Sequence, residues 1–180
     1  MHCGVQGRDQ AMNDQDIRKK AYKKGFQFER EYHGCAQCVV GALYEIFPEL
    51  RNGDIFRSAS GLAAGTGLTT KGQCGGLSGA VMVISQIRGR EIAEMADPEG
   101  KRFVAHRLAE KMVDHFTREF GTVTCGEIQK KLMGRIFYLK DPEQHQAFED
   151  AGGHSHVCPH VVGMATSWAA ELIQREIGND

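Results

Sequence analysis

Apolar residues recur three, four or seven positions apart along most of the chain, which is the spacing of amphipathic helices. Residues 14–32 show this spacing in Ile17, Ala21 and Phe28. Residues 74–87 are apolar on nearly every face, which is typical of a buried helix. We expect helices over residues 14–32, 35–46, 53–64, 74–87, 101–120 and 159–177, with shorter helices that begin near Thr124 and at Pro142.

Strand signals are nearly absent, and the chain contains 22 glycines, with a concentration between Gly61 and Gly79. No Gly-Lys-Ser/Thr triplet follows them, so these glycines favour tight turns and close helix contacts over a phosphate-binding loop. The sequence therefore predicts an all-α fold, a compact bundle of about six to seven helices with glycine-rich connections. We expect a single helical domain over residues 14–180, preceded by a mobile arm over residues 1–13.

Charge and hydropathy exclude two classes of partner. The 22 Lys and Arg residues are balanced by 23 Asp and Glu residues, which gives a net charge of −1. A nucleic-acid-binding surface normally needs a basic excess, so we expect no nucleic acid as partner. The longest apolar run covers residues 80–84, far short of the roughly 20 residues that a membrane span needs. The first residues lack the apolar core of a signal peptide, so we expect a cytoplasmic protein without membrane insertion.

The six cysteines are the most informative residues, because in a reducing compartment cysteines favour redox or metal-binding roles over disulfide scaffolds. Four of them lie where we expect helices to begin: Cys35, Cys74, Cys125 and Cys158. The free N–H groups and partial positive charge of a helix N-terminus favour the thiolate, which is the better nucleophile and metal ligand. The alternative is that these cysteines are packed as small apolar side chains.

Cys35 and Cys38 form a Cys-x-x-Cys pair at the start of a predicted helix, a spacing typical of thiol–disulfide chemistry. Cys35 would be the attacking thiol and Cys38 the resolving one. The equal alternative places Cys38 in the core as a packing residue. Because the first turn carries no acidic residue and His33 precedes it, we expect Cys35 to be the most reactive thiol.

Three histidines accompany Cys158 in the segment His154-Ser155-His156-Val157-Cys158-Pro159-His160. His154, His156 and His160 offer ligands for zinc, iron or copper. No matching pair lies at zinc-finger spacing, and a solvated loop is the favoured alternative.

The order of these motifs resembles a small prokaryotic family to which redox activity is attributed, named C_GCAxxG_C_C for its cysteine pattern. The resemblance covers about residues 16–176 and is carried by Cys35-Ala36-Gln37, Cys74-Gly75-Gly76-Leu77-Ser78-Gly79, Cys125-Gly126-Glu127-Ile128 and Cys158-Pro159-His160. Gly76 replaces the usual alanine, a small-for-small change. The resemblance implies functional roles for Cys35, Cys74, Cys125 and Cys158, whereas Cys3, Cys38 and the histidines depart from the family pattern.

Three hypotheses remain open. The first is a redox protein that uses thiol–disulfide or electron-transfer chemistry at the four cysteines, with a redox protein, a small thiol or an electron donor as partner; as an enzyme it would be an oxidoreductase. The second is a protein that binds zinc or an iron–sulfur cluster through Cys35, Cys74, Cys125 and Cys158. The third is a structural or interaction module, in which the small residues serve helix packing or a homodimer interface.

Overall fold

The computed structural model describes residues 13–178, which form eight α-helices and no β-strand. The predicted all-α class is confirmed, and the helix count is eight rather than six to seven. The helices are α1 (Asp14–Tyr32), α2 (Cys35–Ile46), α3 (Gly53–Ser58), α4 (Gly75–Arg88), α5 (Lys101–Phe120), α6 (Cys125–Met133), α7 (Pro142–Asp150) and α8 (Cys158–Ile177). Of the arm expected over residues 1–13, all but Asn13 lies outside the described residues.

Short polar side chains fix where several helices begin. Asn13 accepts a hydrogen bond from the Asp16 N–H at the start of α1, and Asn52 caps α3 in the same way. Asp141 caps α7, directly before Pro142. These side chains satisfy N–H groups that have no partner within the helix. The helix expected over residues 53–64 is shorter than predicted: α3 ends at Ser58, and a 3₁₀ turn, Ala59–Leu62, follows it.

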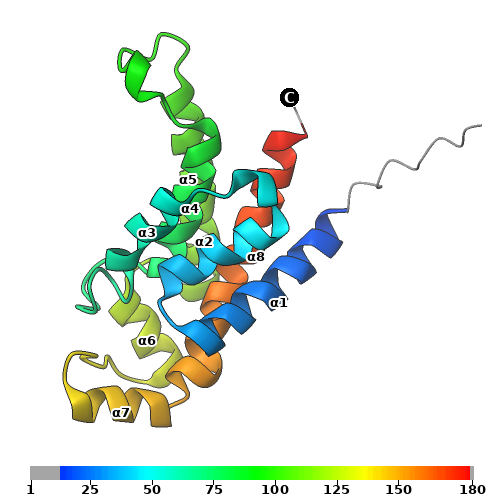
Figure 1. Ribbon diagram of the computed structural model, residues 1–180. Helices are drawn as coiled ribbons and strands as arrows, with labels where there is room; N and C mark the ends of the chain where they lie inside the picture. The colour runs from blue at the N-terminus through cyan, green and yellow to red at the C-terminus, as the bar shows by residue number, and fades with distance from the viewer. Residues whose placement is uncertain (1–12, 179–180) are drawn as a thin grey trace, which may run out of the picture.

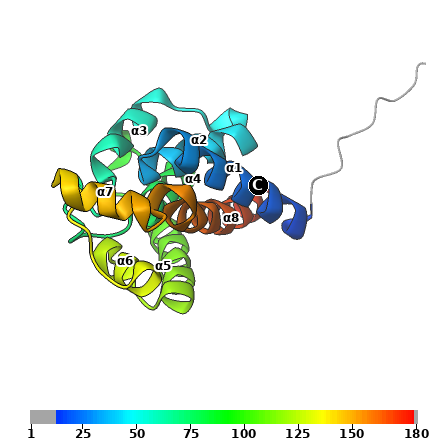
Figure 2. The same ribbon diagram turned by 90° about the horizontal axis from the view of Figure 1, so that it is seen from below.

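Helix α8 is the central element of the bundle. It packs most extensively against α1 and also contacts α2, α4 and α5 (Figures 1 and 2). Small residues permit the close approach of α1 and α8. A Cβ at Gly25 would lie 3.0 Å from the Val162 carbonyl oxygen, and a Cβ at Gly163 would lie 2.9 Å from the Tyr22 ring. Glycine thus serves helix packing here, as the sequence indicated.

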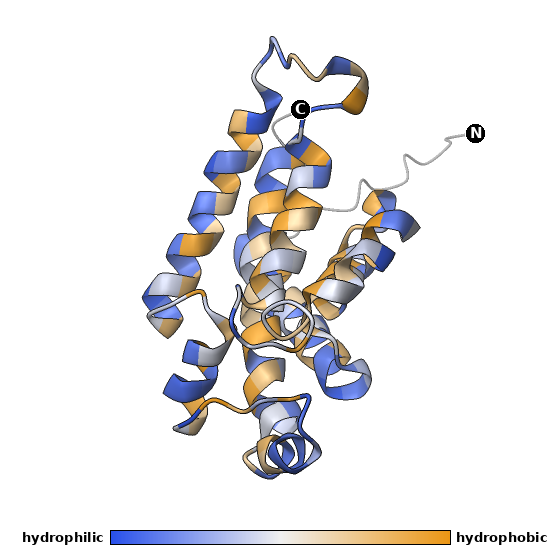
Figure 3. Ribbon diagram, turned by 90° about the vertical axis from the view of Figure 1, so that its left-hand side faces the viewer, coloured by the Kyte–Doolittle hydropathy of each residue, from blue (hydrophilic) through white to orange (hydrophobic). Residues whose placement is uncertain are grey.

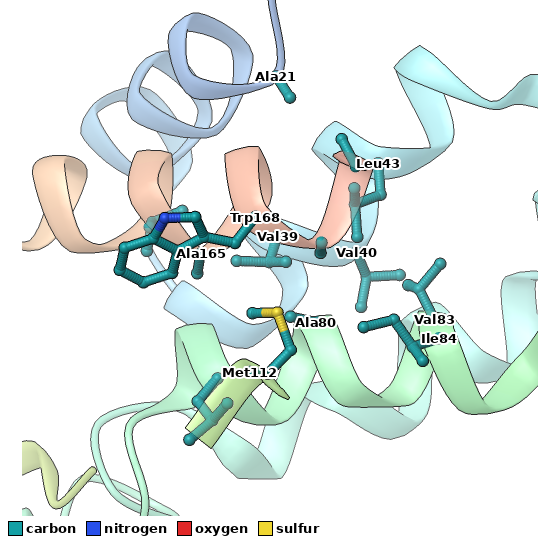
Figure 4. Close-up of a cluster of buried hydrophobic side chains, with 14 of the residues drawn as sticks. Ala21, Val39, Val40, Leu43, Ala80, Val83, Ile84, Met112, Ala165 and Trp168 are labelled. Carbon is teal, nitrogen blue, oxygen red and sulfur yellow. The ribbon is translucent and has the colours of Figure 1, made fainter. Parts of the chain in front are cut away.

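One apolar core lies where α2, α4, α5 and α8 meet. Figure 4 shows the side chains of the four helices directed toward one another across this space. The largest of them are fully or almost fully buried: Val39, Leu43, Val83, Ile84, Met112 and Trp168. Removing such side chains from water is the main favourable contribution to folding, at about 25 cal/mol per Å².

Apolar and polar residues are interleaved along each helix (Figure 3). Among the described residues, none of the helices combines the length and the unbroken apolar character that crossing a membrane requires.

The short helices α6 and α7 lie at one end of the bundle, opposite the end that carries the C-terminus (Figure 1). A π-helical turn, Gly153–Val157, joins α7 to α8 and packs against both, as well as against α1. Rare π turns of this kind occur frequently at functional sites.

Candidate functional site

Each of the four cysteines Cys35, Cys74, Cys125 and Cys158 stands at the beginning of a helix. Cys35, Cys125 and Cys158 are the first residues of α2, α6 and α8, and Cys74 is the residue directly before α4. The sequence prediction of helix-start cysteines therefore agrees with the structure. The four helices differ in direction, but their starting points converge.

The convergence encloses one cavity of about 240 Å³, and all four cysteines line it. The rest of the wall is mostly apolar and includes Leu68, Ile128, Phe148 and Val161. Cys38, by contrast, does not line the cavity; it is 4% exposed and its thiol donates to the backbone oxygen of His33 at 3.0 Å.

The thiols are close neighbours but are not bonded to one another. All five described cysteines are free. Each of the four cavity thiols interacts electrostatically with others of the set. Within the described residues, however, no three cysteine sulfurs all lie within 4.8 Å of one another. The sulfurs therefore surround a shared space instead of touching.

A strained loop between the 3₁₀ turn Ala59–Leu62 and α4 ties three of the helix starts together. Residues 64–68 all have positive φ, a conformation that costs non-glycine residues about 1–2 kcal/mol each. The loop is held by backbone hydrogen bonds from Gly126 to Thr70 (2.8 Å) and from Cys125 to Gly72 (3.0 Å). The Ala64 N–H points to the Cys35 sulfur at 3.5 Å. The glycine concentration in the sequence marked this segment, but not its role in bringing α2 and α6 together.

Burial controls the protonation of the thiols. Desolvation raises the pKa of Cys74 and of Cys125 to about 12, raises that of Cys35 further, and raises that of Cys158 well above its ordinary value. Helix-start N–H groups do act in the opposite direction: those of Gly76 and Leu77 lower the pKa of Cys74. They are outweighed because a buried charge loses more hydration than a few donors restore. Burial therefore argues against the local electrostatic reason for expecting Cys35 to be the most reactive thiol.

Glu29, on α1, is a site residue that the sequence analysis missed. It lines the cavity, is only 2% exposed, and its Oε2 has no hydrogen-bond partner among the described residues. Burial raises the pKa of the Glu29 carboxyl to about 7, and a hydrogen bond with the Cys38 thiol partly offsets that rise. A local signal did exist: Glu29 continues the four-residue spacing of Ile17, Ala21 and Gly25, and therefore lies on the buried face of α1.

The three predicted histidines do not act together. His154 lines the cavity, and its Nδ1 lies 2.5 Å from Glu149 Oε1. His156 is exposed and pairs with Ser155, and the His160 ring pairs with the Tyr22 hydroxyl at 2.9 Å. The structure instead brings His33 next to His154, at a ring-centroid distance of 4.0 Å.

Comparison with known protein families matches residues 33–172, most of the chain, to the family described as "Putative redox-active protein (C_GCAxxG_C_C)". Neither the curated proteins nor the solved structures contained a match. The matched span includes the starts of α2, α4, α6 and α8, with the four cysteines that line the cavity. The chain therefore belongs to the C_GCAxxG_C_C family of putative redox-active proteins.

Proposed function

We propose that the protein is an electron carrier whose redox group is an iron–sulfur cluster held by Cys35, Cys74, Cys125 and Cys158. One observation carries the proposal: four free thiols, from four separate helix starts, line a single cavity. Four cysteine thiolates are the usual ligand set of such clusters. The assignment deepens the redox activity that the family name gives only in general terms.

The chemistry of the donor set fits a cationic centre. Thiols in an apolar cavity have raised pKa values because the few N–H groups nearby compensate a buried thiolate only in part. A bound metal reverses this, since coordination deprotonates the thiol outright. The four thiols are thus poor nucleophiles but suitable ligands.

The spacing of the sulfurs favours a cluster over a single ion. Tetrahedral zinc with Zn–S bonds of 2.3 Å would bring its sulfurs to about 3.8 Å from one another. No three of the described sulfurs lie even within 4.8 Å. A cluster is wider than one ion and takes ligands that lie further apart, so this lower bound on the sulfur spacing is compatible with iron–sulfur and less so with zinc.

The protein's own residues would position the cluster and tune its potential. When bound, the cluster supplies one-electron transfer. The apolar wall around Leu68, Ile128 and Val161 limits water near the sulfurs, and the N–H groups of Gly76 and Leu77 face the Cys74 sulfur. Hydrogen bonds to the sulfurs and solvent exposure are two of the features that set the potential of such a centre.

A second candidate is thiol–disulfide exchange, which the position of Glu29 beside Cys38 favours. In that reaction Cys35 and Cys38 would form one S–S bond, while the S–S bond of a partner disulfide breaks and its two sulfurs take up the two protons. Glu29 could carry a proton between them, since its pKa lies near neutral pH. The deep burial of Cys38 and the raised pKa of Cys35 weigh against this candidate.

The decisive experiment is iron and acid-labile sulfide analysis of protein purified anaerobically, and again after reconstitution with ferrous iron and sulfide. We expect a brown protein with iron and sulfide in equal amounts, and loss of both in Cys74→Ser and Cys125→Ser. Cys38→Ser is the matched control and should keep its cluster, because Cys38 lies off the cavity. A colourless protein after reconstitution overturns the proposal, and thiols that then pair reversibly on oxidation would support the second candidate.

A further inference from the structure

We propose that His33, Glu149 and His154 form a binding site for a divalent transition-metal ion beside the cysteine cavity. The proposal does not depend on the cluster, because it uses none of the thiols. The three residues come from the end of α1, from α7 and from the π turn, and the fold brings them to one place.

The donor atoms already lie at near-ligand spacing. One ligand atom from each residue falls within 4.8 Å of the other two. Glu149 Oε1 and His154 Nδ1 are 2.5 Å apart. The rings of His33 and His154 stand nearly perpendicular, with centroids 4.0 Å apart. Two imidazole nitrogens and a carboxylate oxygen need only small adjustments to reach the 2.0–2.2 Å bonds typical of zinc.

The backbone fixes two of the donors. His33 has φ 57° and ψ 173°, a conformation that non-glycine residues rarely adopt. It is held there by its own N–H, which donates to the backbone carbonyl oxygen of Glu29 at 3.2 Å, and by its carbonyl oxygen, which accepts a hydrogen bond from the Cys38 thiol. Gly152, with φ 85°, starts the π turn that carries His154. Glycine adopts such a φ without strain, whereas the conformation of His33 is of the strained kind that clusters at ligand sites.

Neighbouring side chains support the remaining donors. The His154 ring packs edge-on against Phe148, with centroids 4.9 Å apart, and is itself largely buried. His145, one helical turn before Glu149, places its Nε2 3.4 Å from Glu149 Oε1. An outer partner of this type orients a ligating carboxylate.

The donor set defines the class of ion. Imidazole suits zinc, copper, iron and nickel, whereas calcium and magnesium prefer oxygen ligands alone. Two histidines and one carboxylate leave coordination positions free, as in sites that also bind a substrate or water. Because His33 and His154 both line the cavity, the free positions would be reached from it. The competing explanation is that Glu149 is only a hydrogen-bond partner that orients His154.

Cobalt titration of the anaerobic, reduced protein separates these explanations. Cobalt bound by nitrogen and oxygen gives weak visible bands, whereas thiolate ligation adds an intense near-ultraviolet band. We expect wild-type protein to bind one equivalent with the first signature. His33→Gln and Glu149→Gln should weaken this binding by more than about 100-fold, and His145→Gln by about 10- to 100-fold, as for an outer partner.

His156→Gln is the matched control, since it removes a histidine two residues from the site and should bind cobalt as wild type does. Circular dichroism confirms that each variant is folded, and His33→Gln has the advantage that the side chain is exposed. Iron and sulfide content should be unchanged in all four variants, which keeps this test separate from that of the cluster. Equal cobalt binding by His33→Gln, Glu149→Gln and His156→Gln, or thiolate-type bands alone, would overturn the proposal.

Discussion

Gly75 lies directly against the sulfur of Cys35, so that any side chain at Gly75 would overlap that sulfur. The same added Cβ would stand 2.9 Å from the Leu62 carbonyl oxygen and 3.2 Å from the Ala36 nitrogen. Backbone atoms cannot rotate away as a flexible side chain can. The glycine that starts α4 thus allows the starts of α2 and α4 to meet, and two of the four thiols with them.

Replacement of Gly75 and of its neighbour Gly76 by alanine should have opposite effects. Gly75→Ala must displace Cys35 or α4, so we expect a loss of stability of about 1–3 kcal/mol and loss of the bound iron. Gly76→Ala makes only ordinary contacts, the nearest at 3.6 Å, and should be neutral or stabilise the helix by up to about 1 kcal/mol. Urea unfolding and iron analysis of the two variants check this. Equal stability and equal iron content in the two variants would show that the close contact between Gly75 and Cys35 does not restrict the residue at position 75.

The helical fold could be predicted from the sequence because its signals are local. The apolar spacing of α1 and α5 is regular, and glycine or a capping residue marks most helix ends. The helix-start position of Cys74 and Cys158 could be predicted for the same reason. The predicted end of α3 was wrong, because a 3₁₀ turn replaces the last turns of the helix expected there.

The residues that line the cavity together could not be predicted from the sequence, because their arrangement depends on tertiary packing. Glu29 shares the buried face of α1 with Ile17 and Ala21, but that α1 turns this carboxyl into the cavity is decided by its packing against other helices. Desolvation of the thiols opposes the local expectation for Cys35, and it could not be foreseen because it is a property of the assembled cavity. Glu149 and His33 are separated by more than a hundred residues and carry no shared motif.

The Glu29 carboxyl should make the stability of the cluster-free, reduced protein depend on pH. Its pKa rises from an ordinary 4.5 to about 7 in the folded state because it is buried. Below pH 4.5 the group is protonated in both states and has no effect. Between pH 4.5 and 7 the unfolded chain has released a proton that the folded chain retains. The free energy of unfolding therefore falls as the pH rises through this interval, by about 3 kcal/mol in all.

Glu29→Gln removes this dependence, because the amide cannot ionise. Urea unfolding between pH 4.5 and 8 should show a smaller fall for Glu29→Gln than for wild type, with the variant the more stable of the two at pH 8. The comparison cancels the other titrating groups, which both proteins share. Parallel pH profiles for the two proteins would mean that the carboxyl is charged and stabilised within the fold.

Thiol labelling should follow burial and not helix-start electrostatics. The pKa of Cys125 is raised to about 12, less than that of Cys35, so Cys125 has the larger thiolate fraction. We expect limiting iodoacetamide at pH 7.5 to modify Cys125 before Cys35 in the reduced, metal-free protein, and both far more slowly than after unfolding in urea. Peptide mapping after brief labelling measures the order. Preferential labelling of Cys35 would restore the helix-start argument.

Two glutamines offer a matched test of how the wall beside α7 is held. Gln129 Oε1 accepts the N–H of Phe137 at 2.9 Å in the buried interior, and Gln144 Oε1 accepts the N–H of the next residue, Tyr138, at 3.0 Å in contact with solvent. Phe137 in turn packs against Phe148, which lines the cavity. The buried bond therefore anchors a segment that supports the site.

Substitution by methionine keeps the size of each side chain but removes the acceptor. Gln129→Met leaves the Phe137 N–H buried without a partner, which should cost about 1–3 kcal/mol in urea unfolding. In Gln144→Met water can replace the lost acceptor, so the cost should stay below about 1 kcal/mol. Hydrogen exchange of the Phe137 amide should accelerate in Gln129→Met and remain unchanged in Gln144→Met. An equal loss of stability in both variants would contradict the prediction, because it would show that burial does not make the Gln129 hydrogen bond more important than the exposed one. The Phe137–Phe148 contact would then be what holds this part of the wall.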